Sequence, residues 1–218
     1  MKKHLYIAMV MVAAFAAALG SFLLFSPDEP RGSVDAEPAV EALHVRESSH
    51  RLTRPERSEL TVVEFLDFEC EACGAVYPVV EELREKYQDR VTFVARYFPM
   101  PGHRNGELAA RTVEAAAQQG KFEQMYSKLF TTQAQWGEAK ESKETVFRDY
   151  AEQLGLDMGQ FDAALKDPAT TARVRVDQRD GLGLGVQGTP AFFLDGERVS
   201  PASKEEFEAL IKDRLSRP

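Results

Sequence analysis

The only two cysteines of this 218-residue chain lie three positions apart, at Cys70 and Cys73, where one type of periodicity gives way to another. Residues 61–68, TVVEFLDF, are rich in β-branched and aromatic side chains, which predicts a buried strand. Residues 70–87 repeat apolar side chains at helical spacing, with charges on the other face. The chain is therefore expected to pass from a strand into a helix at Cys70. This strand–helix unit limits the folds that the chain can adopt.

Three interpretations of the cysteine pair are open, and two of them have little support. A disulfide across positions i and i+3 of a helix is geometrically allowed, but it closes so small a ring that it stabilises the fold little. Half of a metal site would need further ligands, and the sequence has no second cysteine pair. The remaining histidine candidates are scattered: His4, His44, His50 and His103.

A reversible redox pair is the interpretation that the local pattern favours. The N-terminus of a helix carries partial positive charge and unpaired amide donors, which stabilise a thiolate at Cys70. Cys73, one turn further into the helix, would be shielded. It would act as the resolving thiol that attacks a mixed disulfide formed at Cys70.

The rest of the chain alternates between strand and helix patterns that complete an α/β sandwich. A second strand is expected over residues 90–98, joined to the first by a parallel crossover, and a short edge strand within 42–52. Asp195-Gly196 predicts a hairpin turn within residues 189–200, and 203–215 a final helix that Ser203 caps. The helical insertion between these parts is predicted from five segments: 106–120, 121–131, 143–155, 158–167 and 171–181.

The N-terminal 41 residues predict a membrane anchor and a tether. After a basic start, residues 5–25 form 21 uncharged positions, about the length that crosses a ~30 Å hydrocarbon core as a helix. A cleaved signal peptide is the alternative, with residues 16–18 as its small-residue site. The basic residues stay inside, so the domain lies outside the cytoplasm, where disulfides persist. Residues 26–41 are polar and proline-rich, as in a flexible tether before a domain over 42–218.

Three features together resemble a membrane-anchored DsbA-like protein, a thiol–disulfide oxidoreductase of the thioredoxin-fold superfamily. The resemblance covers about residues 43–214 and implies a thioredoxin fold with an inserted helical domain at about 103–182. The features are the segment Glu64-Phe65-x-Asp67-Phe68-x-Cys70-x-x-Cys73, the helical block, and Gly188-Thr189-Pro190-Ala191.

The resemblance implies roles for individual residues beyond the two cysteines. Pro190 would be a cis-proline that faces the cysteine pair, with the backbone of Thr189 open to pair with an extended client segment. Glu64 would be the buried acid that moves the proton on and off the inner thiol. The alternatives are an ordinary trans proline that opens a strand, and a Glu64 that points to solvent.

Three more residues near the cysteines enter the expected site. Glu71 and Ala72, between the cysteines, would contact the client. His103 follows the second strand, and we expect it to be a structural hydrogen-bonding group rather than a catalytic base. Metal ligands are not expected.

The dipeptide between the cysteines departs from the strongest oxidants of the family, which carry a proline and a histidine there. This chain has Glu71-Ala72, and Glu69 precedes Cys70. Two nearby carboxylates disfavour a thiolate, and a less stabilised thiolate makes a less oxidising disulfide. We therefore expect a reduction potential below the about −120 mV of DsbA and closer to the about −180 mV of protein disulfide isomerase.

The expected function is an oxidase that introduces disulfide bonds into exported cysteine-containing proteins through Cys70 and Cys73. The resemblance implies a quinone-linked membrane partner that reoxidises the pair, with no cofactor besides the disulfide. The net charge of −8 argues against nucleic acid, and a monomer is expected. Two alternatives stay open: an isomerase or reductase kept reduced outside the cell, and a client-binding module without chemistry.

Overall fold

The computed structural model describes residues 43–217, and every element named below lies in that range. The predicted anchor over residues 1–25 and the tether over 26–41 fall outside the described residues. Within residues 43–217, no helix combines the length and the apolar composition that crossing a membrane requires.

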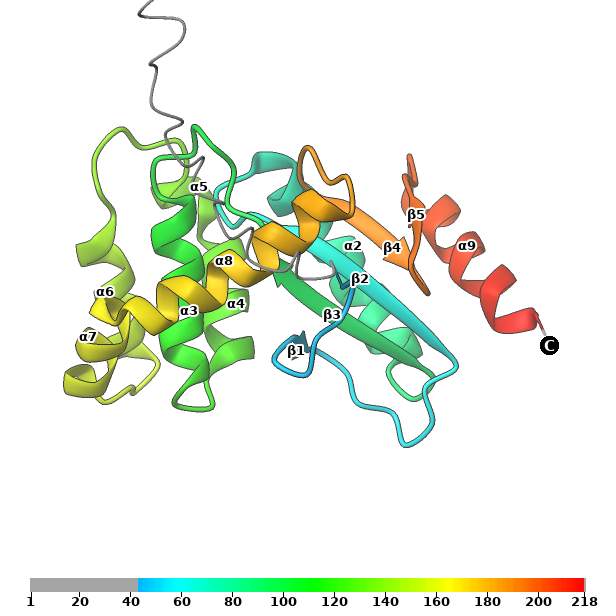
Figure 1. Cartoon of the computed structure of the whole chain (residues 1–218), viewed down its shortest axis with the longest axis horizontal. Coiled ribbons are helices and arrows are strands. Elements are labelled where there is room, and N and C mark those ends of the chain that lie inside the picture. Colours follow the sequence, from blue (N-terminus) through cyan, green and yellow to red (C-terminus); the bar gives the residue numbers. More distant parts are fainter. Residues whose placement is uncertain (1–42, 218) are drawn as a thin grey trace, which may run out of the picture. The chain divides into compact units, whose positions relative to one another are not determined.

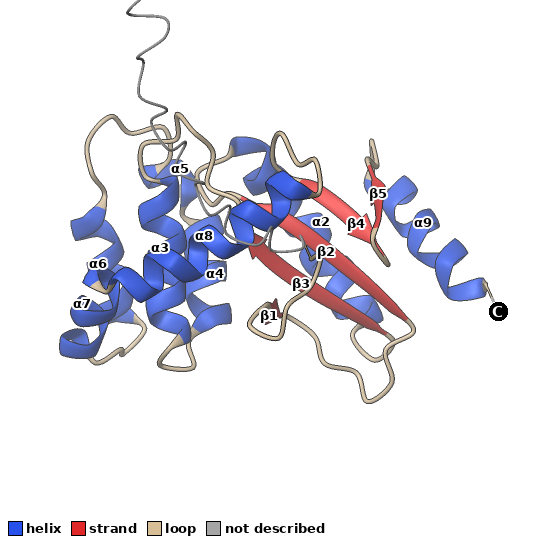
Figure 2. Ribbon diagram, in the orientation of Figure 1, coloured by secondary structure: helices blue, strands red, loops and turns tan. Residues whose placement is uncertain are grey.

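A mixed five-stranded sheet forms the centre of the fold, in the order β1-β3-β2-β4-β5 (Figure 2). The two central strands are parallel to each other, and the three outer strands run antiparallel to their neighbours. The predicted edge strand within 42–52 exists, but it is only two residues long. The strands are β1 (His50–Arg51), β2 (Leu60–Leu66), β3 (Val91–Tyr97), β4 (Ala191–Leu194) and β5 (Glu197–Val199).

Helix α2 (Glu71–Tyr87) forms the crossover between the two parallel strands, as the periodicity predicts. Pro78 lies inside α2 without ending it. The register aligns Leu60 with Val91, so the two strands start level and the chain leaves β2 at the edge where Cys70 lies.

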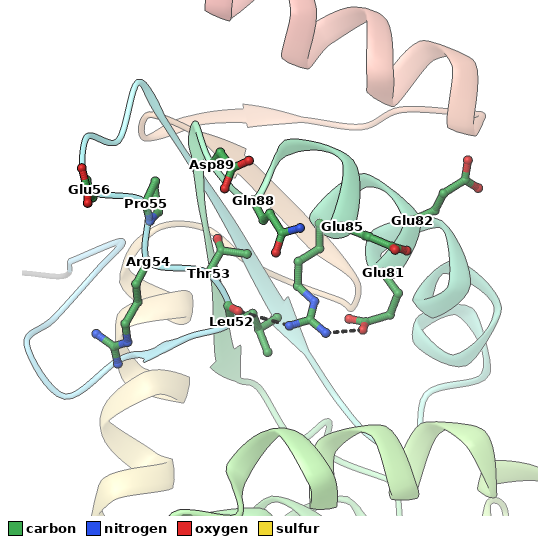
Figure 3. Close-up of a pocket in the computed structure, with 11 residues that line it drawn as sticks. Leu52, Thr53, Arg54, Pro55, Glu56, Glu81, Glu82, Glu85, Gln88 and Asp89 are labelled. Carbon is green, nitrogen blue, oxygen red and sulfur yellow. Dashed lines mark hydrogen bonds and ion pairs between the residues drawn. The ribbon is translucent and has the colours of Figure 1, made fainter.

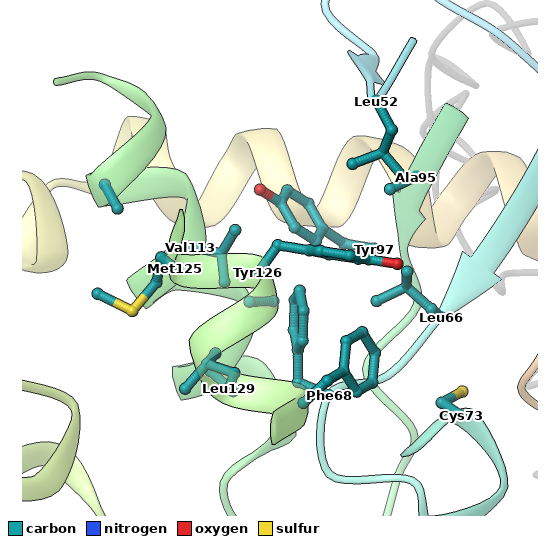
Figure 4. Close-up of a cluster of buried hydrophobic side chains, with 14 of the residues drawn as sticks. Leu52, Leu66, Phe68, Cys73, Ala95, Tyr97, Val113, Met125, Tyr126 and Leu129 are labelled. Carbon is teal, nitrogen blue, oxygen red and sulfur yellow. The ribbon is translucent and has the colours of Figure 1, made fainter. Parts of the chain in front are cut away.

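The two faces of β2 pack into different apolar clusters, because side chains alternate along a strand. Val63 and Phe65 belong to the smaller cluster. Val62 and Leu66 belong to the larger one, together with Cys73 of α2 (Figure 4). Glu64, two residues from each of Val62 and Leu66, therefore faces the side of the sheet that α2 covers.

Six helices lie between β3 and β4, one more than the five segments predicted. The extra helix is α5, a single turn that is too short to show any periodicity. Asp157 and Asp167 cap α7 and α8, each accepting a bond from a backbone N–H of the helix. The helices are α3 (Gly106–Ala117), α4 (Phe122–Thr131), α5 (Gln133–Trp136), α6 (Glu144–Gln153), α7 (Met158–Lys166) and α8 (Pro168–Gly183).

The chain closes with the predicted hairpin and helix α9 (Lys204–Ser216), which follow the helical block in Figure 1. Asp195 and Gly196 have φ values of 46° and 83°, the left-handed backbone that a two-residue hairpin turn needs. Ser203 Oγ accepts from the N–H of Glu206 at 3.2 Å. The Glu206 carboxylate accepts in return from Ala202 N, one residue before the position that a capping box uses.

Candidate active site

Cys70 lies where β2 gives way to α2 and is the N-cap residue of the helix. Its Sγ donates to the carbonyl oxygen of Thr189 at 3.3 Å, across 119 positions of sequence. The peptide bond between Thr189 and Pro190 is cis. Both thiols are free, with Cys70 partly exposed and Cys73 0 % exposed. The two segments that the resemblance singled out therefore meet at the Cys70 sulfur.

The two thiols have opposite acidities because their surroundings differ. The pKa of Cys70 is lowered to about 5, chiefly by the hydrogen bond from Cys73 and further by backbone N–H groups at the start of α2. Burial raises the pKa of Cys73 well above its ordinary value, and the charge of Glu64 adds to this. Cys70 is thus suited to be the attacking thiolate, while Cys73 keeps its proton.

The expectation that Glu69 and Glu71 weaken the Cys70 thiolate is wrong in its premise. The carboxylate of Glu69 is turned away into the interior, where it accepts from the backbone N–H of Asn105 at 2.5 Å. Glu71 is exposed to solvent, which screens its charge. The pKa of Cys70 is low despite both acids, because hydrogen bonds to the sulfur dominate.

Glu64 is buried at the centre of the sheet, with 6 % of its surface exposed. Its neighbours across the two ladders are Ala95 and Phe192, so it is not a residue at a solvent-facing strand edge. Burial, together with the smaller effects of the charges of Glu81 and Cys70, raises the pKa of Glu64 to about 8. A carboxyl group of this kind can hold a proton at neutral pH and release it when a neighbouring charge changes.

Asp67 holds the loop after β3 against the start of α2, a role the sequence did not indicate. Its buried carboxylate accepts from the backbone N–H groups of Glu69 at 2.9 Å and Met100 at 2.7 Å. It also contacts His103 Nδ1 at 2.6 Å. Burial acts to lower the pKa of His103, but the bond and charge of Asp67 outweigh it and raise the pKa. His103 is therefore a hydrogen-bonding group.

A cavity of about 500 Å³ opens beside Cys70. Glu71 and Ala72 form part of its wall, the position expected for client contacts. Its walls also include Glu69 and His103, which were expected near the cysteines. Loop residues that the sequence did not connect with the site complete the walls: Gly102, Arg104, Glu138, Ala139 and Lys140. Within residues 43–217, no three histidine, cysteine or acidic side chains converge as ligands for a metal ion.

Comparison with known proteins places this arrangement in a family. A family model described as thioredoxin matches residues 55–213. The chain belongs to the thioredoxin family. A thioredoxin-like oxidoreductase from Silicibacter pomeroyi DSS-3 is 27 % identical, with a TM-score of 0.68 over 81 % of this chain and 98 % of that one. The thioredoxin family and fold that the resemblance implies are thus confirmed.

Two further solved structures share the fold of this thioredoxin-family chain at lower identity. Wolbachia pipientis alpha-DsbA1 is 19 % identical, with a TM-score of 0.69 over 79 % of this chain and 93 % of that one. BdbD from Bacillus subtilis, in its oxidised form, is also 19 % identical, with a TM-score of 0.67 over 81 % of this chain and 100 % of that one.

The curated proteins that are similar in sequence are named Na(+)/H(+) antiporters. The Na(+)/H(+) antiporter NhaA of Herminiimonas arsenicoxydans is 35 % identical over 192 residues, which cover 87 % of this chain. The Na(+)/H(+) antiporter NhaA 3 of Salinispora tropica is 32 % identical over 213 residues, or 93 % of this chain. The chain spans only 30 % and 32 % of the lengths of these two relatives.

Proposed function

We propose that this chain is an extracytoplasmic thiol–disulfide oxidoreductase that oxidises cysteine pairs in exported proteins. The observation that carries the proposal is the environment of Cys70. Its sulfur lies at the start of α2, has a pKa of about 5 and contacts the Thr189 carbonyl beside a cis-proline. A thiolate that is stable at neutral pH is a good leaving group, so a disulfide that contains it is readily reduced by a client.

The reaction proceeds in two exchanges. A client thiolate attacks Cys70 Sγ, forms a mixed disulfide and breaks the Cys70–Cys73 bond, and Cys73 leaves and takes up a proton. A second client thiolate then attacks the client sulfur of the mixed disulfide, forms the client disulfide and releases Cys70 as a thiolate. Two electrons pass from the client to the cysteine pair. Glu64 supplies the proton to Cys73, and the backbone of Thr189 holds the client segment.

Reoxidation of the pair requires an electron acceptor, for which we propose a quinone-linked membrane protein. The antiporter relatives join a region similar to this chain to a protein that moves ions across a membrane. This supports a location of the domain at a membrane surface. The periplasmic thioredoxin-like protein of Salmonella enterica serovar Typhimurium, 22 % identical with a TM-score of 0.65, has the same fold. We propose single-pass anchoring with the domain outside the cytoplasm.

A mixed-disulfide trap tests the proposal directly. In Cys73→Ala the resolving thiol is gone, so Cys70 should accumulate covalent complexes with exported cysteine-containing proteins that a reductant releases. Cys70→Ser is the matched control and should capture none. Absence of any reducible complex in Cys73→Ala would count against the enzyme.

The redox state of the two cysteines in living cells distinguishes the oxidase from its alternatives. An oxidase keeps Cys70 and Cys73 oxidised at steady state, whereas an isomerase or reductase keeps them reduced, which thiol labelling distinguishes. A module that only binds clients would retain its clients in Cys70→Ser.

A further inference from the structure

The buried position of Glu64 leaves open how its proton reaches solvent. Each catalytic cycle moves one proton onto Cys73 and one off it. Glu64 must therefore regain a proton each time it gives one to Cys73. The sheet and α2 enclose Glu64 on both sides, and only 6 % of its surface is exposed. Cys70, the partly exposed group of the site, carries the reacting sulfur and is covered by the client during the exchange. A second route to solvent is therefore needed.

A row of polar side chains along α2 leads away from Cys73. Residues four apart on a helix lie on one face, and Cys73, Tyr77 and Glu81 follow at this spacing. The Tyr77 ring packs edge-on against Tyr126 at 5.6 Å between ring centroids, and Tyr126 and Cys73 belong to the same core cluster. The row thus runs inside the layer between α2 and the helical block, on the side that Glu64 faces.

Two polar atoms in this layer have no hydrogen-bond partner among the described residues. They are Glu81 Oε1 and the hydroxyl of Tyr126, whose residue is 1 % exposed. Buried polar groups are nearly always paired, so an unpaired carboxylate oxygen and an unpaired phenol in the same layer call for an explanation. The charge of Glu81 acts on both Glu64 and Tyr126, since it raises the pKa of each. The three groups therefore lie within one electrostatic neighbourhood.

The Glu81 end of the row borders a cavity of about 900 Å³ between α2 and the segment 52–56. Glu81 is part of its wall, and Figure 3 shows Glu81 turned towards Leu52 while Glu82 points away. Glu81 Oε2 accepts from Arg84 Nη2 at 2.6 Å, and Arg84 Nη1 donates to the Leu52 carbonyl at 3.1 Å. Glu81 thus has one oxygen held at the cavity and one directed into the protein.

We propose that Glu81 is the residue through which Glu64 exchanges protons with the solvent of this cavity. The inference rests on the proposed oxidoreductase function. It makes Glu81 a positioning residue for that reaction, although Glu81 lies outside the cysteine site. When Cys73 leaves as a thiolate, it takes the proton of Glu64, and Glu64 takes one in turn from the Glu81 side. When the pair is reoxidised, the Cys73 proton follows the reverse path. One proton moves in each direction along this path, while the two electrons enter and leave through the sulfur exchanges and not through Glu64 or Glu81.

The charged and titratable groups around Glu81 come from α2, α4 and β2. Arg84 on the same helix pairs with it, and Glu123 of α4 shares this arginine at 2.9 Å. The charge of Glu81 also acts on Tyr77 of α2, Tyr126 of α4 and Glu64 of β2. Glu82 and Glu85 lie on the same helix and line the same cavity.

The test compares Glu81→Gln with Glu85→Gln in the full chain. Glutamine keeps the shape of the side chain and can still accept from Arg84, but it cannot carry the proton. The measurement is the rate at which the oxidised protein oxidises a dithiol peptide, in weak buffer across pH 5.5 to 8.5. We expect Glu81→Gln to be slower by about tenfold, less than the 10²–10⁴ typical of a group at the reacting atom. Glu85→Gln should match the wild type.

Rescue by a small acid separates proton transfer from a structural role. Formate or acetate can enter the cavity and carry the proton, so either should restore the rate of Glu81→Gln in a concentration-dependent way without affecting the wild type. Glu81→Asp, which keeps a carboxylate, should retain most of the rate. Full activity of Glu81→Gln, or a slow rate that no small acid restores, overturns the proposal. An inactive wild type would instead refute the oxidoreductase function itself, and the relay with it.

Discussion

At the scale of single residues, Cys70 and Glu64 carry opposite shifts in acidity for different reasons. Cys70 gains hydrogen bonds to its charged form and remains partly exposed, so its pKa falls to about 5. Glu64 is buried between the sheet and α2. Because burial disfavours the charged carboxylate, the pKa of Glu64 rises to about 8. Both shifts favour the same chemistry, because one group supplies a stable thiolate and the other stores a proton near it.

The ionisation of Cys70 is the first prediction at this scale. Thiolate absorbance near 240 nm should appear in the reduced protein with a midpoint near pH 5. In Cys73→Ala the midpoint should move to higher pH, because the hydrogen bond from Cys73 is the largest cause of the low pKa. Cys70→Ser provides the baseline and should show no step in this range. A wild-type midpoint near that of a free thiol, about 8.5, would contradict the assignment.

The second prediction concerns Glu64 and the pH dependence of stability. The folded protein holds the Glu64 proton up to about pH 8, whereas the unfolded chain releases it near its ordinary pKa of 4.5. Stability from this group is therefore fully present below pH 4.5 and is lost as pH rises towards 8. Urea denaturation of the oxidised forms should show that Glu64→Gln lacks this loss. The difference is several kcal/mol, up to roughly 5 if the whole shift is expressed.

At the scale of elements, a buried ionic network joins β3 to α8. Arg96 is 0 % exposed, and its Nε donates to Asp177 at 2.7 Å and its Nη2 to Asp180 at 2.5 Å, both on α8. Its Nη1 donates to the carbonyls of Leu43 and His44, which fixes the start of the described chain to the same site. The network thus secures the helical block, through α8, to the sheet that carries Glu64.

Removal of Arg96 is the prediction at this scale. Arg96→Leu leaves two buried carboxylates without one partner, although Arg173 and Arg46 still pair with them at 2.7 Å and 2.5 Å. We expect a loss of about 3 kcal/mol in the free energy of unfolding, the lower end of the range for a broken buried pair.

An exposed arginine is the control for Arg96→Leu. Arg90 pairs with Glu59 at the surface, so Arg90→Leu should cost less than about 1 kcal/mol. Urea titration of both variants is the measurement, and similar losses in the two would refute a special role for the buried network.

At the scale of the whole molecule, the reduced fold is stabilised by the Cys70 thiolate and the oxidised fold is not. This difference makes the disulfide oxidising, by an amount that follows the acidity of the thiol. A pKa of about 5 lies between the values of about 3.5 for DsbA and about 7 for thioredoxin. The reduced form should therefore unfold at higher denaturant concentration than the oxidised form at neutral pH.

The reduction potential is the prediction that follows for the molecule. It should lie below the about −120 mV of DsbA and closer to the about −180 mV of protein disulfide isomerase. Equilibration of the full chain with glutathione mixtures, followed by thiol labelling, measures it. A value at or above that of DsbA would refute the link between the acidity of Cys70 and the potential.

The sequence by itself determined the local structure and the place of Cys70 at the start of a helix. The β-branched and aromatic composition of β2, the helical spacing in α2, Asp195-Gly196 and Ser203 were all interpreted correctly, because each depends on residues close together along the chain. Cys70 as the residue at the start of α2 follows from the same local rules. Helix α5 was missed, since a single turn is too short to leave a pattern.

Only the tertiary structure decided how distant residues combine. The bond between Cys70 and Thr189, the contact of Asp67 with His103, and the partner of Glu69 all join segments at least 36 positions apart. No local pattern specifies such contacts, because they depend on how the elements pack. The acidity of Cys70 was misjudged for this reason: the charges adjacent in sequence were visible, but the direction of the Glu69 side chain is set by packing against the start of α3.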